Sequence, residues 1–220
     1  MIADALNQLR AALPSGVQLV AVSKFHPVER LMEAYNAGQR IFGENRPQEL
    51  ASKVPQMPAD VQWHFIGHLQ TNKLKLVLPY ASLVQSVDSF HLLEAINNWG
   101  AANNKVIDIL LELHLGAEET KQGFSEEEIL GIFASGGGEP SELANVRVRG
   151  LMGMATNTED ESRIESDFAR IEKLFNKIKS FGLPYFDTLS IGMSGDWPIA
   201  VKHGATMVRI GTDIFGPREY

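Results

Sequence analysis

Cysteine is absent from the 220 residues of this chain. The absence excludes disulfides, thiolate metal ligands and a thiol nucleophile, and it suits a reducing, cytoplasmic compartment. No apolar run approaches the ~18 residues that span a bilayer, and the first residues lack the basic and apolar regions of a signal peptide. The formal net charge is −7, without a cluster of lysine and arginine. We therefore expect a cytoplasmic protein that binds neither membranes nor nucleic acid and whose ligand is small.

The sequence does contain a regular alternation of strand-like and helix-like segments. Residues 2–12 carry apolar side chains at helical spacing, and Pro14-Ser15-Gly16 ends this first helix. Short runs rich in apolar and β-branched residues follow, separated by amphipathic segments. The eight predicted strands are residues 17–23, 41–43, 61–67, 83–87, 106–115, 146–154, 189–193 and 206–211.

No hairpin signal separates consecutive strands, so their connections are parallel crossovers. Eight such units in 220 residues fit an α/β fold, the (β/α)₈ TIM barrel with an extra N-terminal helix. No change of composition divides the chain, which predicts a single domain over residues 1–220. A doubly wound open sheet is the alternative, but it needs a glycine-rich fingerprint that AVSKFHP at 21–27 lacks.

Two details of the connections are also predicted. Ser125 and Glu128 have the spacing of a capping box at the start of a helix. The three glycines at 136–138 are expected to form a loop before the sixth strand.

The seventh and eighth strands each end in a turn of small residues, at 193–196 and 211–213, which we call the phosphate loops. Exposed backbone N–H groups in such turns bind anions, and the corresponding loops of (β/α)₈ barrels frequently hold a phosphate. The alternative is that these glycines only turn the chain. Asp196 is placed to cap the helix that follows. The expected phosphate ligands are Ser194, Gly195, Gly211 and Thr212.

Two cationic residues belong to strands that barrel closure makes neighbours. Lys24 ends the first strand on the same face as Val20 and Val22. A lysine beside a phosphate site is typical of Schiff-base chemistry, and burial together with the nearby Arg209 charge is expected to lower its pKa. The alternative is a strand-end lysine that extends into solvent. Arg209 interrupts the apolar eighth strand, so its guanidinium needs an acceptor, either a ligand or a core carboxylate.

Several motifs resemble the pyridoxal phosphate (PLP) homeostasis proteins, single-domain barrels of fold type III related to the barrel half of alanine racemase. The resemblance runs nearly end to end, and its last motif is the most specific. The motifs are AVSK at 21–24, FGEN at 42–45, WHFIGHLQTNK at 63–73, RGLMGMA at 149–155, LSIGMSGD at 189–196 and GATMVRIGTDIFG at 204–216.

The resemblance implies that Lys24 holds PLP as an internal aldimine. It further implies that Arg209 faces the pyridine nitrogen and that Asn45 is an additional contact near the ring. The phosphate ligands it implies are Ser194, Gly211 and Thr212.

Two departures from the family pattern occur. Arg46-Pro47 replaces a usual aromatic residue, and His114 stands where asparagine is common. Neither is expected to touch the lysine or the phosphate loops.

An arginine opposite the pyridine nitrogen keeps that nitrogen unprotonated, which makes the ring a poor electron sink. Alanine racemases compensate with a tyrosine from a second domain, and this chain ends at Tyr220 directly after the last strand. His64, His68 and His114 are candidates for a substitute base, with packing residues as the alternative.

Three functional hypotheses follow. The first is a monomeric PLP-binding protein that buffers the cofactor or delivers it to PLP-dependent apoenzymes, with little or no catalysis. The second is a minimal PLP-dependent amino-acid racemase. The third is a sugar-phosphate enzyme that uses Lys24 as its amine.

Overall fold

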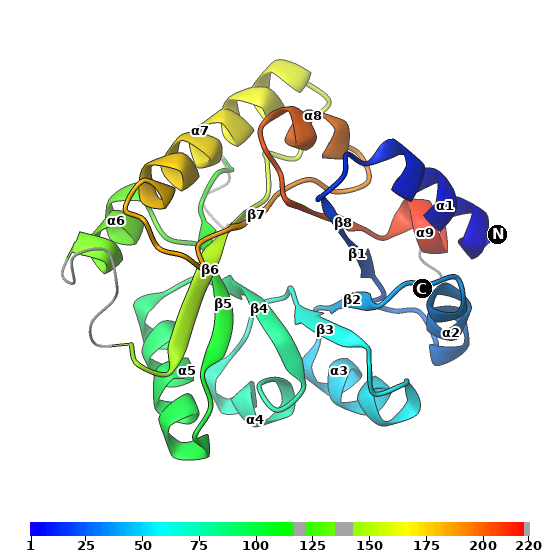
Figure 1. Ribbon diagram of the computed structural model, residues 1–220, viewed down its shortest axis with the longest axis horizontal. Helices are drawn as coiled ribbons and strands as arrows, with labels where there is room; N and C mark the ends of the chain where they lie inside the picture. The colour runs from blue at the N-terminus through cyan, green and yellow to red at the C-terminus, as the bar shows by residue number, and fades with distance from the viewer. Residues whose placement is uncertain (117–121, 135–142, 218–220) are drawn as a thin grey trace.

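The computed structural model describes residues 1–116, 122–134 and 143–217. A closed barrel of eight parallel strands, arranged in sequence order, forms its centre (Figure 1). The predicted (β/α)₈ fold is therefore confirmed. The strands are β1 (Gln18–Val22), β2 (Ile41–Glu44), β3 (Gln62–Phe65), β4 (Ala81–Val87), β5 (Ile107–Leu113), β6 (Val146–Gly153), β7 (Thr188–Ser190) and β8 (Met207–Ile210).

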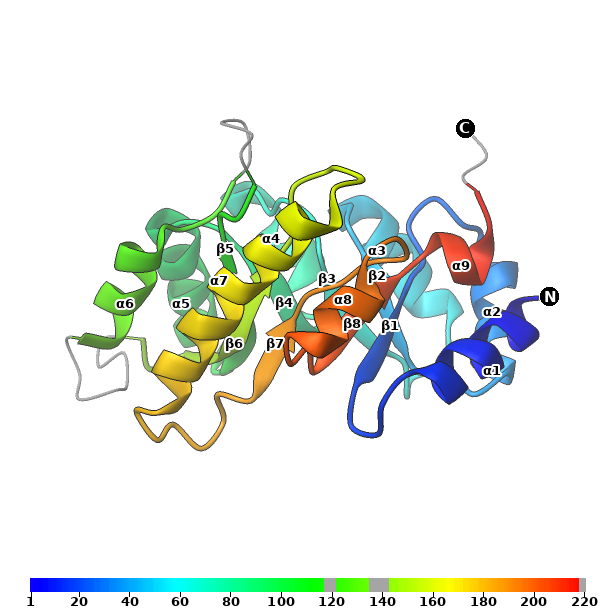
Figure 2. The same ribbon diagram turned by 90° about the horizontal axis from the view of Figure 1, so that it is seen from above.

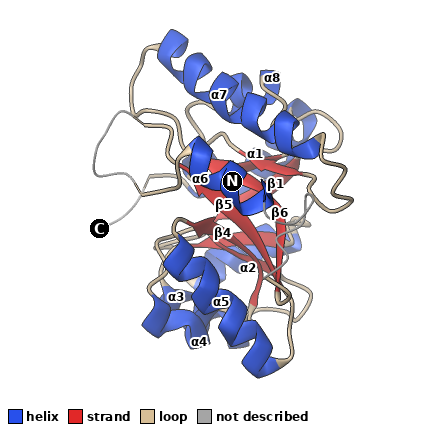
Figure 3. Cartoon of the chain, turned by 90° about the vertical axis from the view of Figure 1, so that its left-hand side faces the viewer, coloured by secondary structure: helices blue, strands red, loops and turns tan. Residues whose placement is uncertain are grey.

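Helices follow the strands and surround the barrel (Figures 1 and 3). The first helix, α1 (Ile2–Ala12), precedes β1 and packs beside the second and last helices, so the extra N-terminal helix is also present. The others are α2 (Val28–Asn36), α3 (Pro47–Lys53), α4 (Leu74–Val77), α5 (Phe90–Asn103), α6 (Glu126–Ala134), α7 (Glu161–Lys179), α8 (Trp197–Lys202) and α9 (Thr212–Phe215), with the 3₁₀ turns η1 (Val54–Gln56) and η2 (Thr71–Lys73).

Apolar side chains form two separate layers because successive residues of a strand point to opposite faces. Leu19 and Ala21 of β1 belong to the large outer cluster between strands and helices. Val20 points the other way and joins a small cluster inside the barrel, whose members are Val20, Leu83, Leu110, Met152 and Met207. Val22, the last residue of β1, continues this alternation and points to the same side as Val20.

Helix ends agree with their capping residues. Ser125 and Glu128 exchange side-chain and backbone hydrogen bonds of 2.8 and 3.1 Å, which confirms the capping box. The long helix α7 begins at Glu161, because the Asp160 side chain accepts a bond from the Ser162 amide and so caps it. The glycine run at 136–138 lies outside the described residues.

The register of the closing strand pair brings the chemically interesting segments together. Val20 of β1 is paired with Arg209 of β8, and Ala21 with Ile210. The end of β1 therefore adjoins the loop after β8, and Figure 2 shows both beside the β7–α8 connection. No helix in the described part of the chain has the length and apolar character needed to cross a membrane.

Candidate functional site

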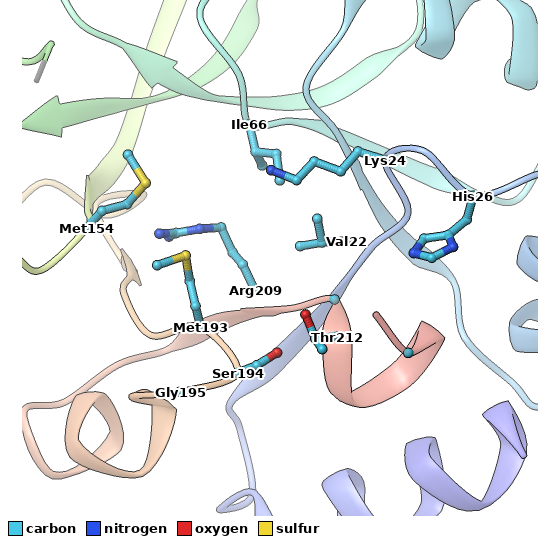
Figure 4. A pocket seen from close by; sticks show the side chains of 12 residues that line it. Val22, Lys24, His26, Ile66, Met154, Met193, Ser194, Gly195, Arg209 and Thr212 are labelled. Atoms are coloured by element: carbon cyan, nitrogen blue, oxygen red, sulfur yellow. The ribbon is translucent and has the colours of Figure 1, made fainter. Parts of the chain in front are cut away.

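A cavity of about 220 Å³ opens at the carboxyl ends of the strands. Six of the seven predicted site residues line it, and they come from the turn after β1, the β7–α8 loop, β8 and the start of α9 (Figure 4). The complete lining is Val22, Lys24, His26, Ile66, Met154, Met193, Ser194, Gly195, Arg209, Gly211, Thr212 and Gly216. Segments at opposite ends of the sequence thus form one site.

Lys24 lies just beyond β1, in a turn that leads to α2. Its side chain extends across the cavity beside Ile66, while Ser194 and Thr212 line the side nearest α8 and α9 (Figure 4). The predicted inward direction of the lysine agrees with this arrangement, whereas the solvent-directed alternative does not. An amine and two hydroxyl groups consequently face the same enclosed space.

Several residues of the phosphate loops that line the cavity have backbone N–H groups without a backbone acceptor in the described part of the chain. The amides of Ser194, Gly195 and Thr212 make no backbone hydrogen bond to another described residue. Gly192, at the start of the first loop, has a φ of +94°, and a Cβ atom there would lie 2.7 Å from the Cβ of Ala200. Glycine is therefore required for the close approach of this loop to α8. Uncommitted amides beside two hydroxyls are typical of an anion site.

Asp196 does not make the helix cap that its position predicts. It occupies the N-cap position of α8, but no side-chain bond to the first turn is present. Its carboxylate instead accepts a 2.6 Å bond from the Met193 amide. The carboxylate thus closes the loop around Ser194 and Gly195 rather than satisfying the helix.

Arg209 has acceptors that the sequence does not indicate. Only 4% of the residue is exposed, and its Nη1 donates to both the carbonyl and the hydroxyl of Ser190 at 2.7 Å. Nη2 donates to the Gly153 carbonyl at 3.0 Å. The sequence predicted a ligand or a core carboxylate as the acceptor, and for these bonds that prediction is wrong. Groups at the ends of two strands inside the barrel accept the bonds instead. The guanidinium is held in place by the protein alone.

A chain of buried polar groups continues from Arg209 across the barrel interior. The Ser190 hydroxyl donates to Gln85 Oε1 at 2.7 Å, and Gln85 Nε2 lies 2.9 Å from Nδ1 of His64. Burial lowers the pKa of His64 to about 4, so its ring is neutral at physiological pH. His64 thus has the packing and hydrogen-bonding role that the sequence left as one alternative. His68 is exposed and pairs with Asp88 at 3.0 Å.

Glu112 of β5 is the acidic member of this interior layer and is 8% exposed. Burial and the neighbouring Asp88 carboxylate raise its pKa to about 7, while Arg209 acts in the opposite direction. Nearby carboxylates likewise oppose the effect of burial on Arg209, whose pKa is lowered to about 10. Arg209 therefore stays cationic at neutral pH, and Glu112 is near its titration midpoint.

Glu112→Gln is expected to flatten the pH dependence of stability. Between about pH 5 and pH 7 the folded chain keeps the Glu112 proton and the unfolded chain releases it, so wild-type stability falls as pH rises. A tenfold change in proton affinity corresponds to ~1.4 kcal/mol, which gives a fall of about 3 kcal/mol. Urea denaturation of the wild type and of Glu112→Gln at about pH 5 and pH 8 measures the free energy of unfolding of each. If the difference in this free energy between the two proteins is the same at both pH values, Glu112 does not have the raised pKa.

Asn45 is the one predicted site residue that does not line the cavity. It follows β2, and its side-chain oxygen is buried without a hydrogen-bond partner among the described residues. The next residue, Arg46, is one of the departures from the family pattern. Its guanidinium lies 4.6 Å from the ring centre of Phe25. Arg46 thus contacts the residue next to Lys24, closer to the lysine than the sequence suggests.

Five apolar or aromatic lining residues were not among the predicted site residues: Val22, His26, Ile66, Met154 and Met193. Met154 and Met193 flank the cavity, and Ile66 lies beside Lys24 (Figure 4). His26 stacks on Phe215 with ring centres 4.9 Å apart. Ile66 and Met154 lie at the ends of predicted strands, and this position could have indicated that they line the cavity. No other feature of the sequence distinguishes them from core residues. No group of three or more metal-ligating side chains occurs within the described ranges.

A barrel in which a lysine faces two small-residue loops defines a class, the barrel proteins of the alanine racemase N-terminal type. Residues 1–219 match the family described as "Alanine racemase, N-terminal domain". The alanine racemase of Bartonella henselae, solved with covalently bound pyridoxal phosphate, shares the fold with a TM-score of 0.77 at 16% identity. That match covers 99% of this chain and 58% of the racemase.

Within this class the chain belongs to the pyridoxal phosphate homeostasis protein family. The family member from Vibrio alginolyticus is 38% identical over 212 residues, which cover 94% of this chain and 89% of the relative. PipY of Synechococcus elongatus, solved with PLP bound, has a TM-score of 0.87 at 34% identity. That match covers 98% of this chain and 100% of PipY.

Proposed function

We propose that this protein binds PLP on Lys24 and takes part in intracellular PLP homeostasis. The observation that carries the proposal is the shared cavity of Lys24 and the phosphate-loop residues Ser194, Gly195, Gly211 and Thr212. Relatives that bear the homeostasis name, and PipY with bound PLP, support it. In binding, the Lys24 amine condenses with the cofactor aldehyde, a C=N bond forms, and water leaves.

The residues present fit the parts of PLP. The uncommitted amides and the two hydroxyls suit a dianionic phosphate, and Lys24 suits the aldehyde. Arg209, held by three hydrogen bonds to the protein, is a fixed cation that favours an unprotonated pyridine nitrogen. Asn45 stays a proposed contact: its buried, unpartnered oxygen is suited to accept a bond from a ring substituent.

The same residues favour holding the cofactor over transforming an amino acid. PLP supplies an electron sink when bound, and a fixed cation near its nitrogen weakens that property. A racemase also needs a second acid/base, and none of the candidates His64, His68 and His114 lines the cavity. The histidine among the described lining residues, His26, is stacked on Phe215. We therefore propose little or no catalysis. Delivery to PLP-dependent apoenzymes, a monomeric state and a cytoplasmic location complete the proposal.

The phosphate site is tested by replacing both Ser194 and Thr212 with alanine. Hydrogen bonds to charged groups contribute ~1.5–3 kcal/mol each, so PLP affinity should fall at least tenfold. Equilibrium dialysis with PLP and with pyridoxal, which lacks the phosphate, measures the effect. Pyridoxal is the matched control, and its affinity should be the same for the variant and the wild type. Equal wild-type affinities for PLP and pyridoxal would refute the phosphate site.

A further inference from the structure

A buried cluster of charged side chains lies behind Lys24, outside the cavity. Lys53, the last residue of α3, places its Nζ atom 2.7 Å from Glu44 and 2.7 Å from Glu49. The side chains of Lys53 and Glu44 are 6% and 0% exposed, and that of Glu49 is 18% exposed. None of the three lines the PLP cavity, so the proposed function does not use them.

The cluster is bonded to the backbone on both sides of Lys24. Lys53 Nζ donates to the Ser23 carbonyl at 2.9 Å, and Glu49 accepts a bond from the Phe25 amide at 2.7 Å. The Ser23 hydroxyl also donates to Glu44 at 2.6 Å. The residue before Lys24 and the residue after it are therefore both fixed by the same three charged side chains.

The backbone beside Lys24 needs such support because it is strained. Phe25 has a φ of +69°, in the left-handed region that aromatic residues rarely adopt. A conformation of this kind costs ~1–3 kcal/mol and persists only where the surroundings determine it. The bond from the Phe25 amide to Glu49 is one such determinant. The Arg46 guanidinium over the Phe25 ring is another.

The cluster is also costly as a means of folding. It combines two carboxylates with one ammonium, and burial raises the pKa of Glu44 despite Lys53. One Glu44 oxygen is buried without a partner among the described residues. Buried ion pairs often stabilise a fold no better than apolar residues of similar size. A role in geometry explains the cost, since a reacting group must be held closely in position.

We propose that Glu44, Glu49 and Lys53 are positioning residues that direct the Lys24 amine into the cavity. They act through the Ser23 carbonyl and the Phe25 amide, and they do not touch the cofactor. The inference rests on the proposed attachment of PLP to Lys24. It predicts that disturbing the cluster slows the condensation of amine and aldehyde while the phosphate loops keep their affinity.

The test compares Lys53→Met and Glu49→Ala with the wild type in two measurements. The first is the rate at which stoichiometric PLP gives borohydride-trappable protein, which should fall at least tenfold. The second is the affinity for 4′-deoxypyridoxine phosphate, which lacks the aldehyde and should bind unchanged. A general loss of structure would lower both values. Glu49→Gln keeps an acceptor for the Phe25 amide and should recover most of the rate.

Arg149→Met is the matched control, because Arg149 joins Asp108 and Asp187 in an ion cluster near the opposite end of the barrel. This variant should react with PLP at the wild-type rate. Trapping at the wild-type rate in folded Lys53→Met and Glu49→Ala overturns the inference. If Lys53→Met does not fold, the inference is tested by comparing the trapping rate of Glu49→Ala with that of Glu49→Gln. A wild type that traps no PLP instead overturns the proposed function.

Discussion

Lys24→Ala is expected to abolish the borohydride-stable attachment of PLP and leave the fold intact. Among the described residues that line the cavity it is the only lysine, so within that part of the chain no other amine is placed to reach an aldehyde held by the phosphate loops. Alanine removes the nucleophile without disturbing the buried cluster, whose bonds go to the backbone of Ser23 and Phe25. Mass spectrometry after reduction at stoichiometric PLP measures the loss, which should be complete.

The control is Lys105→Ala, which removes an exposed lysine just before β5 and should trap PLP like the wild type. The Lys24→Ala protein should still bind 4′-deoxypyridoxine phosphate, because that analogue depends on the phosphate loops alone. Equal adduct on Lys24→Ala and wild type would show that another lysine carries the cofactor. Loss of analogue binding as well would indicate a damaged cavity.

The main elements of the fold could be predicted because the chain repeats one pattern. Eight strand-like runs without hairpin signals leave few topologies other than a closed parallel barrel. Closure then places the end of the first strand beside the last two loops, which was sufficient to bring Lys24, Ser194 and Thr212 together. Strand parity gave the inward direction of Lys24. These inferences depend on local periodicity and on one topological rule.

The remaining features depend on which polar groups meet after folding. Two of the three acceptors of Arg209 are carbonyls of β6 and β7, and every residue has a carbonyl, so composition cannot indicate them. Asp196 could cap a helix or close a loop, and only the conformation of residues 193–196 decides between these. The Lys53 cluster joins β2, α3 and the turn after β1. Its members have no shared motif in the sequence.

Arg209→Met is expected to destabilise the protein by roughly 3 kcal/mol or more, because the Gly153 and Ser190 carbonyls and the Ser190 hydroxyl lose their buried donor and each unsatisfied buried group costs about 1–3 kcal/mol. The variant removes three hydrogen bonds and the cation that opposes the raised pKa of Glu112. Glu112 then keeps its proton to a higher pH in the folded chain, whereas the unfolded chain releases it as before. The stability of the variant therefore continues to fall above the pH at which the wild type levels off.

Urea denaturation at about pH 6 and pH 9 checks this prediction, and the loss should be larger at pH 9. Asp88 and Asp196 also lie near this layer, so Glu112→Gln alone and the double variant are needed to assign the effect. If Glu112 is the group responsible, the double variant loses the extra destabilisation at pH 9, since its amide has no proton to release. A loss that is equal at both pH values in Arg209→Met would show that the guanidinium stabilises the barrel through its hydrogen bonds alone.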